Sequence, residues 1–204
     1  MNSRKLSLIA VALLLVGTQL MYMGSGSHVS AELPLEPPTA NAFATFTLPS
    51  EMPRYDIPLT LHLQKYIYEK CQKYGLAYEM VLAVIKAESN FVIDVVGVTG
   101  DLGLMQLNPR NTVDWLAKKL NLDFFDPLDP YQNVAAGIWY LAHIRDYWIQ
   151  YTDCQQKTFA LTLLSYNRGI NGATRYVKQH GLKAFNNSYV EKVSAFKQQF
   201  EEGR

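Results

Sequence analysis

Residues 77–90 read Ala-Tyr-Glu-Met-Val-Leu-Ala-Val-Ile-Lys-Ala-Glu-Ser-Asn, and this stretch decides the fold. Its apolar residues follow the i, i+1, i+4, i+5 spacing of one helix face. The residues with this spacing are Met80, Val81, Val84 and Ile85. The spacing predicts a helix with one face turned to a core. Glu88 lies four residues after Val84 and three after Ile85, so it continues that apolar face.

A carboxyl group on an apolar face has an unusual acid strength. Burial disfavours the charged form and raises the pKa of a Glu above its ordinary value of about 4.3. Such a group holds a proton near neutral pH and can donate it, as the acid of a glycosidase does. The spacing also fits a Glu at the end of a helix that turns back to water or accepts a backbone amide. The sequence alone leaves both interpretations open for Glu88.

The chain around this helix is also predicted to be mainly helical. Thr60 and Gly75 are suited to begin and end a helix, as are Asn108-Pro109 and Asp129-Pro130 at two later starts. Two further capping patterns begin at Thr152 and Ser188, and glycines interrupt the helical pattern after Tyr166. The expected helices span about 61–74, 77–90, from 109, 130–150, 155–166, 171–180 and from 188.

One insert departs from the helical pattern. Residues 91–98 are apolar and β-branched, residues 99–101 read as a turn, and residues 103–107 could pair back. This order predicts a short β-hairpin. The expected fold is therefore a mainly α domain with a small β-hairpin insert, and residues 60–204 suffice for a single core.

The first 59 residues are expected to lie outside this domain. Arg4 and Lys5 precede an apolar run from Leu6, and Val29-Ser30-Ala31 is a small-residue cleavage site, so residues 1–31 fit a secretory signal peptide. An uncleaved membrane anchor fits as well, because residues 6–23 reach the length that spans a bilayer. Residues 32–59 hold six of the nine prolines and are predicted to be an extended linker. Both interpretations place the domain outside the cytoplasm.

Composition excludes several classes of protein. Hydrophobic residues make up 49% of the 204-residue chain and its net charge is +1, which excludes a disordered chain and disfavours a nucleic-acid binder. The four histidines show no metal-ligand spacing and no glycine-rich phosphate loop follows a strand, so no metal or cofactor is expected. Cys71 and Cys154 are the two cysteines, and an exported protein allows either a disulfide or two separate thiols.

Four motifs in order resemble the catalytic domain of lytic transglycosylases of the soluble type. They are Glu88-Ser89-Asn90-Phe91, Gly103-Leu104-Met105-Gln106, Ser165-Tyr166-Asn167-Arg168-Gly169 and Tyr189-Val190 followed by Lys192-Val193. Asn133-Val134-Ala135-Ala136-Gly137 matches the start of the family's middle helix, and the resemblance covers about residues 61–200. It implies a lysozyme-like fold and a peptidoglycan glycan strand as substrate.

The resemblance also implies roles for individual residues. Glu88 matches the family's single catalytic acid, and Met105 and Gln106 match the pair that lines the sugar cleft. The remaining matches to substrate-binding positions are Tyr166, Asn167 and Tyr189. Core packing or a helix cap would account equally for some of these residues, namely Met105, Tyr166 and Asn167.

The insert departs from the family pattern. The family often has Ser-x-x-Gly-Ala before Gly-Leu-Met-Gln, whereas this chain has Gly97 and Asp101 at the Ser and Ala positions. Thr99 could supply a hydroxyl in place of the missing Ser. The hydrogen-bonding surroundings of Glu88 are therefore expected to differ from the family's.

Three functions fit these residues. A lytic transglycosylase would cleave the MurNAc–GlcNAc bond and form 1,6-anhydroMurNAc with Glu88 as its single acid and base. A muramidase would hydrolyse the same bond and needs a second carboxylate, for which Asp101 and Asp94 are the candidates. The third function is a non-catalytic peptidoglycan-binding module, which has no reason to retain a buried acid.

Overall fold

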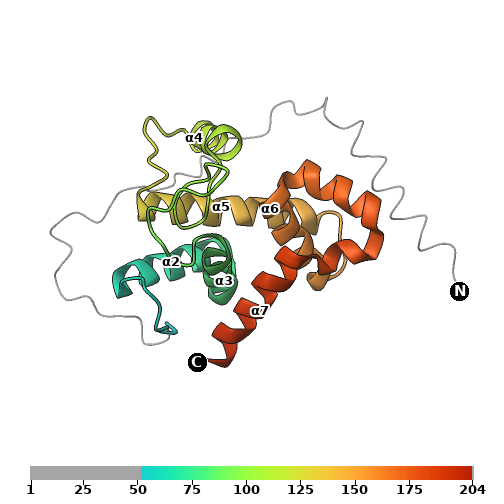
Figure 1. Cartoon of the computed structure of the whole chain (residues 1–204), viewed down its shortest axis with the longest axis horizontal. Helices are drawn as coiled ribbons and strands as arrows, with labels where there is room; N and C mark the ends of the chain where they lie inside the picture. Colours follow the sequence, from blue (N-terminus) through green and yellow to red (C-terminus); the bar gives the residue numbers. More distant parts are fainter. Residues whose placement is uncertain (1–51, 204) are drawn as a thin grey trace, which may run out of the picture. The chain divides into compact units, whose positions relative to one another are not determined.

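The computed structural model describes residues 52–203, and this part of the chain is mainly α-helical (Figure 1). A turn of π-helix at Pro109–Val113 leads into the helix Asp114–Lys119 (α4), and a 3₁₀-helix at Gly181–Asn186 precedes the helix Ser188–Glu202 (α7). Residues 1–31, predicted as a signal peptide or anchor, lie outside the described range. Within that range, no helix has the length and hydropathy needed to cross a membrane. The helices are α2 (Leu61–Tyr74), α3 (Tyr78–Ser89), α4 (Asp114–Lys119), α5 (Pro130–Ile149), α6 (Gln155–His180) and α7 (Ser188–Glu202).

Helix α3 is buried on nearly all sides. The predicted apolar face is confirmed, since Val81, Val84 and Ile85 are fully buried. Leu82 and Ala83, which lie off that face, are fully buried too, because α7 and α2 both pack against α3. Helix α3 is thus a central element of the core rather than an amphipathic helix on its surface.

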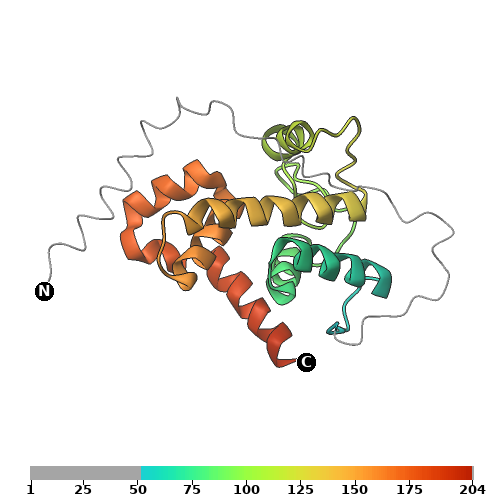
Figure 2. The ribbon, with the colours of Figure 1, turned by 180° about the vertical axis from the view of Figure 1, so that it is seen from behind.

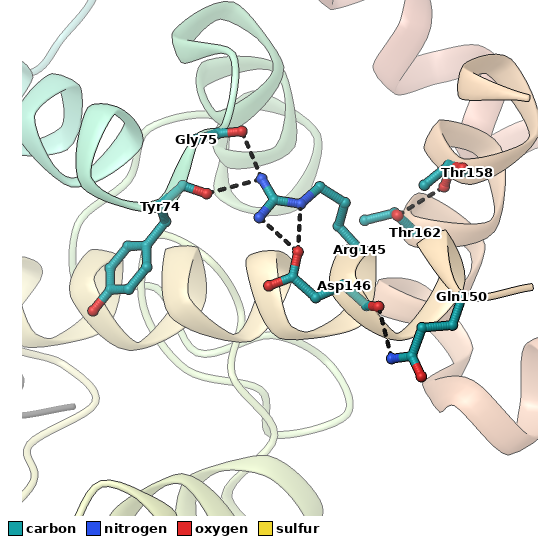
Figure 3. Close-up of polar contacts among 7 residues, drawn as sticks. All are labelled: Tyr74, Gly75, Arg145, Asp146, Gln150, Thr158 and Thr162. Atoms are coloured by element: carbon teal, nitrogen blue, oxygen red, sulfur yellow. Dashed lines mark hydrogen bonds and ion pairs between the residues drawn. The ribbon is translucent and has the colours of Figure 1, made fainter. Parts of the chain in front are cut away.

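Helices α2 and α6 both pack onto helix α5. Figures 1 and 2 show α4 on one side of α5 and the pair α2 and α3 on the other. Arg145 of α5 donates from Nη1 to the carbonyls of Tyr74 at 2.8 Å and Gly75 at 2.5 Å (Figure 3). These carbonyls have no partner within α2, so Arg145 closes the C-terminal end of that helix.

The predicted helix boundaries are largely confirmed. Thr60 caps α2 by accepting from the amide of Leu63 at 3.2 Å, and Gly75, at a φ of 61°, ends it as predicted. Two capping predictions are wrong. Cys154 precedes α6 with no side-chain cap, and Asn187, one residue before the predicted Ser188, accepts from the first amides of α7.

The predicted β-hairpin is also wrong. Within residues 91–108 the structure has only isolated antiparallel bridges, Val96 with Leu102 and Leu102 with Leu107. Gly103 and Gln106 have φ values of 71° and 46°, which extended strands do not tolerate. Residues 103–106 therefore form a tight turn that folds Leu107 back onto Leu102. The amide of Gly103 donates to the carbonyl of Val95 at 2.9 Å, but this contact does not extend into a strand ladder along residues 91–98.

The end of the proline-rich segment packs on the helices. Met52, Tyr55 and Leu59 are buried. The Tyr55 ring lies edge-on to the ring of Phe200 in α7, with 5.1 Å between the ring centres. Gln64 of α2 donates to the carbonyls of Tyr55 and Leu59. Residues 52–59, predicted as part of the linker, are thus an integral part of the packed unit.

Cys71 and Cys154 are free thiols. Cys71 is fully buried in the core, and Cys154 lies at the start of α6 with its Sγ 2.9 Å from Gln156 Oε1. The proposed disulfide is therefore absent.

Candidate functional site

Glu88 lies in the last turn of α3, at the C-terminal end of the helix, and is half-buried. Tyr189 in the first turn of α7 donates a hydrogen bond from its hydroxyl to Glu88 Oε1 at 2.5 Å. Asn187 fixes the start of α7 by accepting from the amide of Tyr189 at 3.0 Å. The close packing of α3 against α7 therefore brings together two residues 101 positions apart in the sequence.

The surroundings of Glu88 favour its protonated form. Burial raises the pKa of Glu88 above its ordinary value, the hydrogen bond from Tyr189 and the charge of Lys192 lower the pKa in part, and the charge of Asp101 raises it further. Of the two interpretations that the sequence left open for Glu88, these surroundings favour the buried acid with a raised pKa. The negative end of the α3 dipole acts in the same direction, because it disfavours a carboxylate at the C-terminal end of the helix.

Lys192 is a member of the site to which the sequence analysis assigned no role. Its Nζ donates to the carbonyl of Ala87 at 2.7 Å, next to Glu88 in the chain. This bond connects α7 to an orphan carbonyl in the last turn of α3, and it holds a positive charge near the carboxyl group. The spacing could have indicated this role, since Lys192 lies three residues after Tyr189 and shares a helix face with it.

Asp101 is close enough to raise the pKa of Glu88, but its own oxygens are occupied. Oδ2 accepts from the hydroxyl of Thr99 at 2.5 Å, and Oδ1 accepts from the side-chain amide of Asn108 at 2.6 Å. Thr99 therefore directs its hydroxyl proton to Asp101. The carboxylate of Asp101 stabilises the turn at residues 99–108, as Asp commonly does in tight turns.

Met105 is placed in the core rather than on the wall of a cleft. Its side chain is fully buried, and a Cβ added at Gly137 of α5 would come within 2.4 Å of its Sδ. Its backbone carbonyl, however, accepts a hydrogen bond from the hydroxyl of Tyr166 at 2.7 Å. Met105 therefore contributes to the site through its backbone, by holding Tyr166 of α6 beside the loop.

Asn133 of α5 fastens this loop and was not predicted as a site residue. Its fully buried side chain accepts from the amide of Met105 at 2.8 Å and donates to the carbonyl of Leu102 at 2.9 Å. Gly103 permits this close approach, since a Cβ there would lie 2.4 Å from Asn133 Nδ2. An amide in the otherwise apolar stretch 133–138 was the available signal, because buried polar groups are nearly always hydrogen-bonded.

Gln106 directs its side-chain amide inward. Nε2 donates to the carbonyls of Gly103 at 2.9 Å and Val95 at 3.2 Å. A Cβ added at Gly97 would lie 2.2 Å from Gln106 Oε1. The Gln106 side chain therefore occupies the space that a Ser would need at position 97, and it braces the loop.

Asn167 is exposed on α6 directly after Tyr166. Two residues later Gly169 leaves the helical conformation, with a φ of 69° and a ψ of 157°, and α6 changes direction there. The predicted interruption at Gly169 is confirmed, whereas Gly172 remains helical. The half-buried Tyr166 and the exposed Asn167 thus end the first part of α6 beside the loop that carries Asp101 and Met105.

The site therefore contains one carboxyl group with a raised pKa, two tyrosine hydroxyls and one lysine ammonium. Burial and the charge of Glu88 raise the pKa values of Tyr166 and Tyr189, so both phenols stay protonated and act as hydrogen-bond donors. Glu88 is the group suited to exchange a proton, while Tyr189 and Lys192 stabilise its ionised form. This combination suits one residue that gives up a proton and takes one back.

Comparison with known proteins identifies relatives of this domain. The family described as "Transglycosylase SLT domain" matches residues 65–189. The membrane-bound lytic murein transglycosylase C of Glaesserella parasuis serovar 5 (strain SH0165) is 29% identical over 125 residues, covering 58% of this chain and 34% of that protein.

A solved structure supports the fold at lower identity. The inactive mutant of lytic transglycosylase Slt from Pseudomonas aeruginosa, in which Gln replaces a Glu, superposes with a TM-score of 0.57 at 19% identity. The superposition covers 72% of this chain and 25% of that chain. This chain thus spans between a quarter and about a third of the proteins it matches.

Proposed function

The chain belongs to the transglycosylase SLT family, and we propose that its domain is a peptidoglycan lytic transglycosylase that cleaves the MurNAc–GlcNAc bond. The observation that carries this proposal is the single half-buried Glu88 carboxyl, with a raised pKa and with its Oε1 held by Tyr189. A glycosidic bond needs an acid to protonate the departing oxygen, and the surroundings of Glu88 keep its proton available.

In the first step, protonated Glu88 donates its proton to the oxygen between MurNAc and GlcNAc, and the bond to the anomeric carbon breaks. Positive charge develops on the sugar ring, as in other glycosidases, and the substrate's own N-acetyl oxygen stabilises it. Glu88 leaves this step as a carboxylate. Tyr189 and Lys192 stabilise that negative charge, since both lower the pKa of Glu88.

In the second step, the Glu88 carboxylate accepts the proton of the C6 hydroxyl on the same MurNAc. The C6 oxygen then bonds to the anomeric carbon and yields 1,6-anhydroMurNAc. Glu88 regains its proton and no water is consumed. A raised pKa serves both steps, because an acid and base of intermediate strength gives and takes a proton with similar ease.

Support for the substrate comes from the family, whose relatives are named as murein and lytic transglycosylases. The solved Slt structure is described as an inactive mutant in which Gln replaces a Glu, and this fits a catalytic Glu in the family. The relative named as membrane-bound supports a place at the cell envelope, outside the cytoplasm. The proposed sugar contacts are Asn167, which is exposed beside Tyr166, and the Tyr189 hydroxyl.

Mass analysis of the products released from purified cell walls by the full chain tests the proposal. A transglycosylase releases muropeptides that are one water lighter than hydrolysed ones and have no reducing end. We expect the lighter products. Products with reducing ends, formed in step with cleavage and lost in Asp101→Asn, would instead establish a muramidase. Release of neither product would contradict both enzymatic functions and favour the peptidoglycan-binding module.

A further inference from the structure

The segment after Asn167 concentrates positive charge. Between Asp153 and Glu191 the sequence has no acidic residue. The basic residues in this interval are Lys157, Arg168, Arg175, Lys178 and Lys183. Four of these five lie in the last part of α6 and the 3₁₀-helix that follows it, in a chain whose net charge is only +1. The positive charge here is therefore local.

Two of these cations share a pocket. The pocket, with a volume of about 390 Å³, is lined by Arg168, Gly172, Arg175, Tyr176 and Gln179. The guanidinium carbon of Arg168 lies 4.5 Å from the centre of the Tyr176 ring. A cation at this distance over an aromatic face is attracted to it, so the ring holds the Arg168 guanidinium in place. Arg168 is exposed, so its guanidinium group remains accessible to a ligand.

A glycine keeps this pocket open. A Cβ added at Gly172 would come within 3.1 Å of the Arg168 Cβ. The backbone at Gly172 is helical and does not itself require glycine. Its lack of a side chain therefore leaves space in the pocket beside Arg168.

Within residues 52–203, the two guanidiniums have no carboxylate partner. Neither Arg168 nor Arg175 forms an ion pair with any residue in the range 52–203. Guanidinium groups bind carboxylates through two parallel hydrogen bonds, which is geometrically specific and stronger than a neutral contact. Two such groups in one concave site favour an anionic ligand over a neutral sugar.

We propose that this pocket binds a carboxylate of the peptide stem carried by the peptidoglycan strand. The inference rests on the proposed function. The pocket begins at Arg168, next to Asn167 and two residues after Tyr166, and the bend at Gly169 separates it from the sugar-binding part of α6. MurNAc carries its peptide on a lactyl group. The carboxylates of this peptide therefore extend away from the sugar whose glycosidic oxygen Glu88 protonates. The sugar and its peptide would then bind to successive parts of one helix.

Binding measured on the full chain tests this inference apart from catalysis. In a Glu88→Gln background, calorimetry compares a disaccharide-tetrapeptide muropeptide with the same molecule after its carboxylates are amidated. We expect the double substitution Arg168→Gln and Arg175→Gln to weaken binding of the carboxylate form about tenfold, as loss of a charged hydrogen bond does. Amidation should weaken binding to the parent protein to a similar extent.

A matched control removes the same charge nearby. Lys178→Gln with Lys183→Gln takes two exposed cations from the same segment and none from the pocket. We expect this pair to change muropeptide binding less than twofold. Equal weakening by both pairs would mean diffuse attraction and would overturn a specific site. Inorganic phosphate that binds as tightly as the muropeptide, with the same loss in the arginine variant, would overturn the peptide as ligand.

Turnover separates failure of this inference from failure of the proposed function. The ratio of kcat/KM for stem-bearing strands to that for strands stripped of peptide should fall about tenfold in the arginine variant. An unchanged ratio, with anhydro products still formed, would overturn the peptide pocket alone. If the unsubstituted chain cleaved neither substrate, the proposed function would fail, while the calorimetry would still decide whether the pocket binds a carboxylate.

Discussion

Helix α3 carries a glutamate near each end, and the two differ in what surrounds them. Glu79 lies in the first turn, is 5% exposed and accepts a hydrogen bond from Tyr55 at 3.0 Å. Glu88 lies in the last turn, is half-buried and accepts one from Tyr189 at 2.5 Å. Each is thus bonded to a tyrosine hydroxyl from a distant segment.

The helix dipole distinguishes these two carboxyl groups. Its positive end stabilises negative charge in the first turn, where Glu79 lies, and its negative end disfavours charge in the last turn, where Glu88 lies. Glu79 therefore suits a permanent structural contact that holds residues 52–59 on the core. The pKa of Glu88 is raised and its carboxyl group is partly accessible, so Glu88 suits proton exchange. Helix position, burial and neighbouring charges together thus give the two glutamates of α3 different roles.

The largest expected effect comes from Glu88→Gln, which removes the exchangeable proton at the C-terminal end of α3. Glu88→Gln should lower the release of anhydro-muropeptides by about 10²–10⁴-fold, because an amide keeps the shape of the side chain but cannot serve as general acid. Glu79→Gln should instead lower the free energy of unfolding by about 1–3 kcal/mol, the usual contribution of a hydrogen bond to a charged group. Mass spectrometry of the products and urea unfolding measure the two effects.

The comparison fails if the two variants exchange their effects. Circular dichroism of Glu88→Gln must show an intact fold for the lost activity to count. Residual activity within tenfold of the unsubstituted protein would remove Glu88 from the chemistry.

A smaller effect is expected from substituting Tyr189 and Tyr55, the tyrosines that donate to Glu88 and Glu79. Tyr189→Phe removes the hydrogen bond that lowers the pKa of Glu88, so the pKa rises. The alkaline limb of the pH–rate profile, where Glu88 loses its proton, should move to higher pH, and kcat should fall about tenfold because the carboxylate formed in the first step is less stabilised. Tyr55→Phe should leave the profile in place and lower the free energy of unfolding by about 1 kcal/mol. An unmoved limb in Tyr189→Phe would show that this hydrogen bond does not tune Glu88.

These contrasts also mark what the sequence could predict. Helix α2 was predicted to the residue, and the apolar face of α3 with Glu88 at its end was predicted from spacing, because both depend on contacts within three or four residues. Tyr189 was found through resemblance, and its bond to Glu88 requires the tertiary packing of α3 on α7.

The loop between α3 and α4 was beyond sequence reasoning for a different physical reason. The left-handed backbone at Gly103 and Gln106 reverses the direction of neighbouring side chains, so Met105 enters the core and Gln106 bonds within the loop. Residue type at Gln106 gave no sign of this conformation. Asn133 stabilises the loop from 28 residues away, which spacing along one helix could not show.

Lys192 sharpens the comparison further, since it is the one cation that lowers the pKa of Glu88 in its described surroundings. Lys192→Met removes that charge and the bond to the Ala87 carbonyl. The other groups that affect this pKa are Tyr189, which lowers it, and Asp101, which raises it, and both remain. The alkaline limb should therefore rise by a few tenths of a pH unit, as expected for an exposed charge. Because the effect is electrostatic, Lys192→Arg should restore the profile, and 1 M salt should reduce the difference.

The smallest expected effect is on stability, and it has the opposite sign to the effect on activity. The pKa of Glu88 is raised on folding, so its contribution to stability is fully present below the unfolded pKa and is lost as the pH rises through the folded pKa. Gln cannot ionise and loses nothing over that range. Glu88→Gln should thus match the unsubstituted protein in melting temperature at pH 4 and exceed it at pH 8. Differential scanning calorimetry at the two pH values measures this difference, and Glu79→Gln serves as the control from the other end of α3. A Glu88→Gln variant that melts lower than the unsubstituted protein at pH 8 would show that the ionised carboxylate stabilises the fold, so that Tyr189 and Lys192 outweigh the effect of burial on Glu88.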